Sequence, residues 1–338
     1  MPDNINEWNA LALANSNFVQ STFYDAIQSF FESTPIYIQL KNEGKLAAGL
    51  KVYYTVSKKM KSLTANISGV LQQFSEFIIV AKFEQQNIDL VRTTFENEIE
   101  KLIQKHQVNK LIVSGYFGPS NQLIQYSKSK LVKDVHFNIA TVDIQKNDEE
   151  LLKSFNRNTK RNVQKAIEEQ LKFVKAKDDL SDFFEVMHAI YIKQQTGVNV
   201  PNFKYIHRAY ELFIKHKMVD VYMVYKGETP IAAMYFYKFG KKAYSSYGGA
   251  VKNNFGAGQF GYYELMKVYR DEGITDFIFG QTGSSNKYLN DKFNVGITNF
   301  KLGFSPTEQP SFTQHFIFSP TKEKIWKAFL KLNALIRG

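Results

Sequence analysis

A glycine-containing loop in the second half of the chain is the first segment whose residues suggest chemistry. It runs from Asn253 to Gly258, between an expected strand and an expected helix. The first turn of a helix offers unpaired N–H groups and a dipole that favour an anion, and glycine lets a ligand approach the backbone closely. The pattern predicts a phosphate site formed by Asn253, Gly256, Ala257, Gly258 and Gln259. The alternative is an ordinary glycine turn before a helix.

A second candidate is a helix with basic residues at every fourth position. Lys153, Arg157, Arg161 and Lys165 share one helical stripe, and Lys160 lies beside it. Arginine can clamp a phosphate with two hydrogen bonds, whereas lysine acts as a point charge. We therefore expect Arg157, Lys160 and Arg161 to bind an anionic substrate. The alternative is a solvated helix face.

A third candidate is the pair Gln281 and Thr282, which follows an expected strand. Open α/β sheets commonly bind ligands at the carboxyl ends of strands, so we expect this pair to contact substrate. Other chemistries have little support. The six histidines lack metal-ligand spacing, and the absence of cysteine excludes a thiol nucleophile. Walker and Gly-x-Ser-x-Gly motifs are also absent, so we expect no metal, no NTPase and no such hydrolase.

The elements that must position these residues follow the same order in both halves. In the first half, the pattern of apolar residues predicts a hairpin (36–40 and 46–54), a strand (77–82), a helix (88–106) and a strand (110–114). The second predicts a hairpin (219–225 and 231–237), a strand (243–247), a helix (262–271) and a strand (276–279). This repeated order predicts two related α/β (α+β) domains, residues 1–146 and 147–338.

Length and composition agree with two folded domains. The 338 residues are 44% hydrophobic and 15% aromatic, which is enough apolar surface for two cores. A formal charge of +11 favours anionic partners such as phosphates, tRNA or an anionic membrane. The polar, acidic start is unlike a secretory signal, and the apolar run 77–81 is far shorter than the roughly 20 residues of a membrane span. We expect a soluble, cytoplasmic protein.

Segments in a fixed order along nearly the whole chain give a family resemblance. Fem-type proteins open with a tryptophan segment and a Gln-Ser step, matched here by Trp8 and Gln20-Ser21. Later matches are Thr141-Val142-Asp143, the basic helix, Pro230-Ile231-Ala232-Ala233, Tyr247-Gly248-Gly249, Tyr263-Glu264-Leu265-Met266, Phe277–Thr282 and Asp291–Gly296. The chain resembles the Fem-type peptidyl aminoacyltransferases of the GNAT acyltransferase superfamily. It departs from their patterns at Asn253, which stands where the GNAT loop has Gln or Arg, and at Ile278, where relatives often carry Asp.

The resemblance implies a tandem GNAT-like fold, with a mixed, largely antiparallel sheet flanked by helices in each domain and catalysis in the second. It implies transfer of an acyl or aminoacyl group from acyl-CoA or aminoacyl-tRNA, with no tightly bound cofactor. The acceptor would be an amine of a peptide, a cell-wall precursor or an amino sugar. Two alternatives remain open: an acyl-CoA-dependent N-acetyltransferase acting on a small amine, and a non-catalytic binding module of the same fold.

Such a transfer needs an amine that loses a proton and donors for the developing oxyanion. Tyr247, at the end of an expected strand, and Glu264, on the helix after the glycine loop, are the candidates for proton handling. Lys292 is the candidate for contacting phosphate or the oxyanion. The alternatives are a core tyrosine, a helix-dipole glutamate and a surface lysine.

The carboxyl-terminal residues 322–337 predict an amphipathic helix with five basic residues. We expect it to dock on the second domain. The alternative is peripheral contact with a membrane.

Overall fold

The computed structural model describes residues 1–56, 69–115, 123–124, 126, 130–193, 202–251, 255–283 and 292–337, and the chain divides into two compact units. Unit 1 is Met1–His136 with Pro310–Gly338, and unit 2 is Phe137–Gln309. The boundaries fall inside two long strands, β6 (Leu131–Asp143) and β12 (Thr307–Ile317). The expected division placed the carboxyl-terminal segment with the second domain. It belongs instead to unit 1, because residues 313–317 of β12 pair with a strand of that unit.

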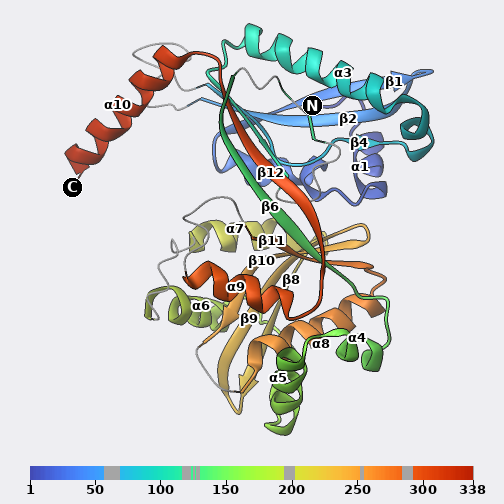
Figure 1. Ribbon diagram of the computed structural model, residues 1–338, viewed down its shortest axis with the longest axis vertical. Coiled ribbons are helices and arrows are strands. Elements are labelled where there is room, and N and C mark those ends of the chain that lie inside the picture. Colours follow the sequence, from blue (N-terminus) through green and yellow to red (C-terminus); the bar gives the residue numbers. More distant parts are fainter. Residues whose placement is uncertain are drawn as a thin grey trace. The chain divides into compact units, whose positions relative to one another are not determined.

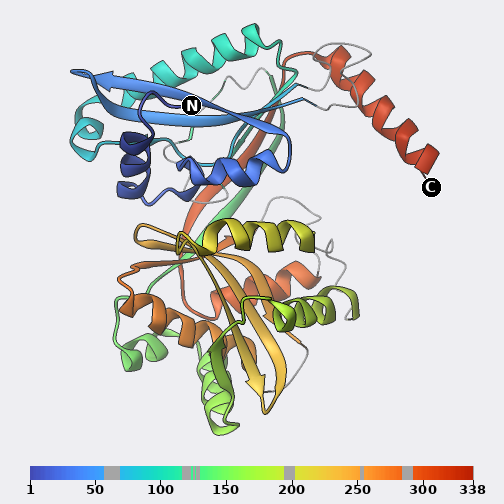
Figure 2. The same ribbon diagram turned by 180° about the vertical axis from the view of Figure 1, so that it is seen from behind.

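Unit 1 is built on a sheet in the order β1-β2-β3-β5-β12. Its strands and helices are α1 (Ile5–Ala14), η1 (Phe18–Gln20), α2 (Phe23–Ser29), β1 (Ser33–Asn42), β2 (Lys45–Thr55), β3 (Val70–Gln73), β4 (Ile78–Ile79), α3 (Ala81–Lys105), β5 (Lys110–Ser114) and α10 (Pro320–Arg337). The pairs β1/β2, β2/β3 and β5/β12 are antiparallel, whereas β3/β5 is parallel. Figures 1 and 2 show α3 over one face of this sheet and α1 with α2 on the other.

Helix α3 covers the sheet with Val91, Phe95 and Ile99, which are fully buried. Their spacing of four residues aligns them on one helical face. Helix α10 starts beside β5: the Asn109 side-chain amide donates to the Glu323 carboxylate at 3.2 Å. The expectation that the terminal helix docks on the second domain is therefore corrected, since its observed contact is within unit 1.

Unit 2 contains a sheet in the order β6-β11-β10-β9-β8-β7. Its further elements are α4 (Asp148–Ser154), α5 (Arg157–Glu168), β7 (Lys172–Lys175), α6 (Ser181–His188), the π-helical turn η5 (Ala189–Lys193), α7 (Phe203–Ile214), β8 (Val219–Lys226), β9 (Thr229–Phe239), β10 (Lys242–Ala250), α8 (Ala257–Asp271), β11 (Asp276–Thr282) and α9 (Lys292–Leu302). The pairs within this sheet are antiparallel except β10/β11, which is parallel.

Helices cover both faces of the unit 2 sheet (Figures 1 and 2). Successive residues of β9 point to opposite faces. Phe236 packs against Tyr262 of α8, whereas Tyr235 packs against Phe183 of α6 and Tyr237 against Phe213 of α7. Each unit is thus a mixed, largely antiparallel sheet flanked by helices, which confirms the predicted fold class. Within the described ranges, no helix is both long and apolar enough to cross a membrane.

Candidate functional site

The sheet of unit 2 opens between β10 and β11. These parallel strands pair only from Lys242/Asp276 to Tyr244/Ile278, although β10 continues to Ala250 and β11 to Thr282. Both strands change register where they part, β10 between Ser245 and Tyr247 and β11 between Ile278 and Gly280. The carboxyl ends of the two strands therefore separate, which is where α/β sheets commonly bind ligands.

The first turn of α8 begins next to this opening. Gly256 is the N-cap residue of the helix at φ +74° and, being glycine, offers no side-chain hydrogen bond to the N–H groups that follow it. A Cβ at Gly256 would overlap the backbone carbonyl of Asn162 in α5, and one at Gly258 would lie 3.3 Å from Phe300 Cε2 of α9. The glycines thus let α5 and α9 pack closely around the start of α8. Ala257 is buried and Gln259 partly exposed, whereas Asn253 lies outside the described residues.

Lys301 of α9 lies at the end of β11. Its Nζ donates to the Gln281 carbonyl oxygen at 2.7 Å, and burial lowers the pKa of this amine to about 8. Among the described residues it has no ion pair. Phe300, the preceding residue, packs against Tyr262 of α8 as well as Gly258. This helix therefore connects the α8 first turn with the end of β11.

Sequence reasoning missed Lys301. Its only signal is a lysine beside Phe300 and Phe304, which are spaced for a buried helical face. A lysine at the edge of such a face usually extends its ammonium group to water. Only the contact with Gln281, twenty residues earlier in the chain, shows that this one does not.

Thr282 lies on the α8 side of the sheet and is 1% exposed. It is directly opposite Asn138 of β6, and further along β6 Ala140 and Val142 belong to the apolar core beneath α8. The Thr282 hydroxyl donates to the carboxylate of Glu308 in β12. The Asn138 amide donates to the same oxygen, Oε1, at 3.4 Å. Sequence reasoning predicted Gln281 and Thr282 as site residues and missed Glu308.

The structure does not bring Tyr247 and Glu264 together. Tyr247 is opposite Tyr235 in the strand register and packs against its ring at 5.7 Å, on the α6 face of the sheet. Burial raises the pKa of Tyr247. Glu264 instead binds Lys267 of the same helix at 3.0 Å, and Lys267 lies 3.7 Å from the Asp148 carboxylate of α4. The side chain of Lys292, the third predicted catalytic residue, lies outside the described residues.

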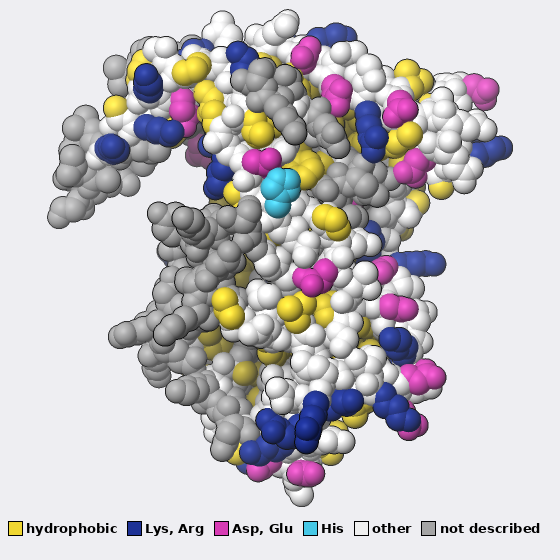
Figure 3. Space-filling model, in the orientation of Figure 1, with side chains coloured by type: hydrophobic (Ala, Val, Ile, Leu, Met, Phe, Trp, Pro, Cys, Tyr) yellow, Lys and Arg dark blue, Asp and Glu magenta, His cyan; other side chains and the backbone are white. Residues whose placement is uncertain are grey.

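The predicted basic residues of α5 lie on the surface of unit 2, where Figure 3 shows Lys and Arg side chains gathered. Arg157 and Arg161 are exposed, and neither has an ion pair in the part of the chain that the structure describes. Lys160 donates to the Lys153 carbonyl oxygen at 3.5 Å. Because Asn162 of this helix touches Gly256, the basic surface continues from the first turn of α8.

Unit 1 has the same order of elements, with α3 between the parallel strands β3 and β5, but its corresponding loop is filled. There Ile78 and Ile79 form β4 and pair with Gly49 and Ala48 of β2. Both isoleucines are buried, and Val80, with φ −69°, precedes the helix in place of a glycine. An apolar strand thus occupies the place that the glycine loop has in unit 2.

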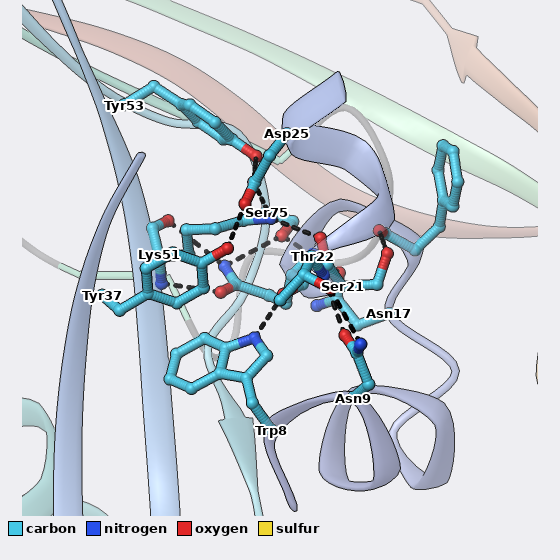
Figure 4. A network of polar contacts seen from close by, with 12 residues as sticks. Trp8, Asn9, Asn17, Ser21, Thr22, Asp25, Tyr37, Lys51, Tyr53 and Ser75 are labelled. Carbon is cyan, nitrogen blue, oxygen red and sulfur yellow. Dashed lines mark hydrogen bonds and ion pairs between the residues drawn. The ribbon is translucent and has the colours of Figure 1, made fainter. Parts of the chain in front are cut away.

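The polar interior of unit 1 is a closed network rather than an open site (Figure 4). Asp25 accepts hydrogen bonds from Lys51 at 2.8 Å, from Tyr53 at 2.7 Å and from Tyr37. Lys51 also donates to the Ser21 carbonyl oxygen. Burial lowers the pKa of Lys51 to about 8, against the opposing effect of Asp25. The network fastens α2 to β1 and β2.

Comparison with known proteins agrees with this geometry. Residues 153–288 match the acetyltransferase (GNAT) domain family. The crystal structure of FemX is similar over 97% of this chain and 98% of its own, with a TM-score of 0.72 at 12% identity. The C-terminal domain of a putative lysylphosphatidylglycerol synthetase from Agrobacterium fabrum is similar over 96% of this chain and 95% of its own, with a TM-score of 0.55 at 12% identity. L-PGS from Bacillus licheniformis is similar over 87% of this chain and 92% of its own, with a TM-score of 0.52 at 12% identity. No curated protein matches the chain in sequence.

The chain therefore has the fold of the GNAT acyltransferases, and the matched range 153–288 lies entirely within its second unit. More particularly, the likeness to FemX extends over both units, so the fold is of the Fem type, as the sequence predicted.

Proposed function

We propose that unit 2 transfers an acyl or aminoacyl group from an activated donor to an amine. Lys301 carries this proposal: its half-buried side chain has no carboxylate partner among the described residues, and its amine is fixed on Gln281 where β10 and β11 separate. Burying an unpaired cation is costly. A lysine that served only packing would gain from reaching water, so its position favours a role in binding developing negative charge.

Lys301 is suited to stabilise the oxygen of the carbonyl under attack. When an amine adds to an ester or thioester, negative charge develops on that oxygen, and a fixed donor in a water-poor site lowers the barrier. The first turn of α8, Ala257–Gln259, is suited to the phosphate groups of the donor. Phe300 packs against this turn, and Lys301 is the next residue along α9. A donor that reaches from the first turn of α8 to Lys301 would therefore be held at its phosphate end and at its acyl end.

Two donors suit these features. Aminoacyl-tRNA is favoured by Arg157, Lys160 and Arg161, which add positive charge on the helix that lies against Gly256. The second candidate, acyl-CoA, is favoured by the glycine loop, whose spacing is that of an acetyltransferase pyrophosphate loop. For the acceptor we propose the amine of a peptide or cell-wall precursor, on the basis of the likeness to FemX.

A donor screen tests the proposal. Thermal unfolding and native mass spectrometry are recorded with acetyl-CoA and with a pool of charged tRNA. A donor at 100 times its Kd should stabilise the protein by about 2.7 kcal/mol. Lys301→Met should retain donor binding and lower kcat about 100-fold or more, as loss of an oxyanion donor does. Unchanged turnover in this variant would contradict the assigned role.

A paired substitution separates the two donors. Arg157→Ala with Arg161→Ala should weaken tRNA binding and reduce its salt dependence, because each phosphate contact contributes to the slope. Arg208→Ala, on α7, is the matched control, since Arg208 is also exposed but pairs with Glu211. Equal tRNA affinity in all three proteins would argue against α5. A protein that binds acetyl-CoA and no tRNA would favour the second candidate.

A further inference from the structure

Glu308 lies at the same end of β11 as Lys301. The Thr282 hydroxyl and the Asn138 amide both donate to its Oε1. Thr282 and Asn138 are opposite each other in the strand register, so two neighbouring strands hold one oxygen of the carboxylate in place. The side chain is exposed on its other side. Oε2 has no hydrogen bond to any described residue.

The Glu308 carboxylate and the Lys301 amine are thus each hydrogen-bonded to one of two successive residues of β11, Thr282 and Gln281. Lys301 is bound to the Gln281 carbonyl, and Glu308 to the Thr282 hydroxyl. The two groups do not form an ion pair with each other, although opposite charges on adjacent anchors would gain by doing so. Each is held by partners of its own, and neither has an ion pair among the described residues.

The anchoring does not require a charge at position 308. Both hydrogen bonds to Glu308 are accepted by a single oxygen, which a glutamine amide can supply equally well. Among the described residues, no contact at this strand end requires the negative charge. An exposed carboxylate beside a site that needs a proton acceptor has a chemical use.

We propose that Glu308 binds the ammonium group of the acceptor and takes its proton, an inference that rests on the proposed acyl transfer. The ammonium group gives one proton to Glu308, and the free amine nitrogen forms a bond to the donor carbonyl carbon. Lys301 holds the resulting oxyanion. The C–O or C–S bond to the carrier then breaks as the nitrogen loses its second proton, which neutralises the departing oxygen or sulfur. Glu308 returns its proton to water.

The test compares two nucleophiles in wild type and Glu308→Gln. One is a peptide with a single lysine amine, which is charged at neutral pH; the other is hydroxylamine, which is neutral there. The donor is whichever of acetyl-CoA or charged tRNA the wild type uses. Glu308→Gln should lower kcat/KM for the peptide about 100-fold, as loss of a general base does, and leave transfer to hydroxylamine nearly unchanged. Thr282→Val should show a smaller loss of the same selectivity, because Thr282 positions Glu308.

Three results would overturn the inference. Equal loss with both nucleophiles would mean that Glu308 is needed only for the shape of the site. Equal activity in wild type and Glu308→Gln would mean that its charge is not used. A wild type that transfers nothing from either donor would overturn the proposed function itself, which the first two results leave standing.

Discussion

Replacing Lys301 by methionine should raise the stability of the protein at pH 7 while lowering its transfer activity. The pKa of the buried amine is about 8, compared with 10.5 for an ordinary lysine. A difference of 2.5 units corresponds to about 3 kcal/mol at 1.36 kcal/mol per unit. At neutral pH the folded protein bears this cost in full, since the amine is charged both folded and unfolded. Methionine removes the cost and also the hydrogen bond to Gln281, which is worth about 1 kcal/mol.

The variant should therefore be more stable than wild type by about 2 kcal/mol at pH 7. As pH rises from about 8 to 10.5, the folded wild type releases the proton while the unfolded chain still holds it. Linkage then stabilises wild type relative to the variant. By pH 10.5 the advantage should have reversed to a deficit of about 1 kcal/mol, the lost hydrogen bond.

Urea unfolding of both proteins at pH 7, 8, 9 and 10 measures this difference, and comparison cancels the titration of all other groups. A difference in unfolding free energy that stays constant with pH would refute the account of Lys301 as a desolvated amine whose ion pair is missing among the described residues. A large destabilisation at pH 7 would refute it as well, because it would mean that the charge has a partner.

Three further predictions follow from contacts already described. Lys51→Met should destabilise the protein by about 3 kcal/mol in urea unfolding, because it leaves Asp25 without its ion pair; a neutral effect would contradict the network. Gly256→Ala should cost about 2 to 4 kcal/mol, from the positive φ and the overlap with Asn162. The control Gly273→Ala, at φ +85° in open space, should cost about 1 kcal/mol, and equal effects would disprove the overlap. In steady-state assays the transfer rate should fall above about pH 8 as Lys301 loses its charge, and Lys301→Arg should abolish this decline; a decline common to both would point to another group.

Local periodicity predicted the elements around the site well. The expected strands 219–225, 231–237 and 276–279 correspond to β8, β9 and β11, with ends shifted by a few residues. The helix expected from 262 begins at Ala257, because Gly256 with its positive φ caps it. In unit 1 the strand expected over 77–82 is reduced to β4, and α3 begins at Ala81 rather than at 88.

The groups that the structure brings together were harder to predict, because they meet across long stretches of chain. Thr282 meets Glu308 from the next strand, and Lys301 meets Gln281 from an intervening helix. Neither contact leaves a repeat or spacing in the sequence. Tyr247 and Glu264 show the reverse case, in which residues close in the expected order of elements are apart in the structure. Their side chains lie on opposite faces of the sheet.

The route of the chain through β6 and β12 has a consequence for biosynthesis. Unit 2 is one continuous stretch, Phe137–Gln309, whereas unit 1 includes residues from 310 onward. β5 stays unpaired on one side until residues 313–317 of β12 have been made. A ribosome that synthesises this chain therefore releases a complete unit 2 before unit 1 can close its sheet. The first-made half of the protein would finish folding last, in contrast to the usual order in which domains fold as they emerge.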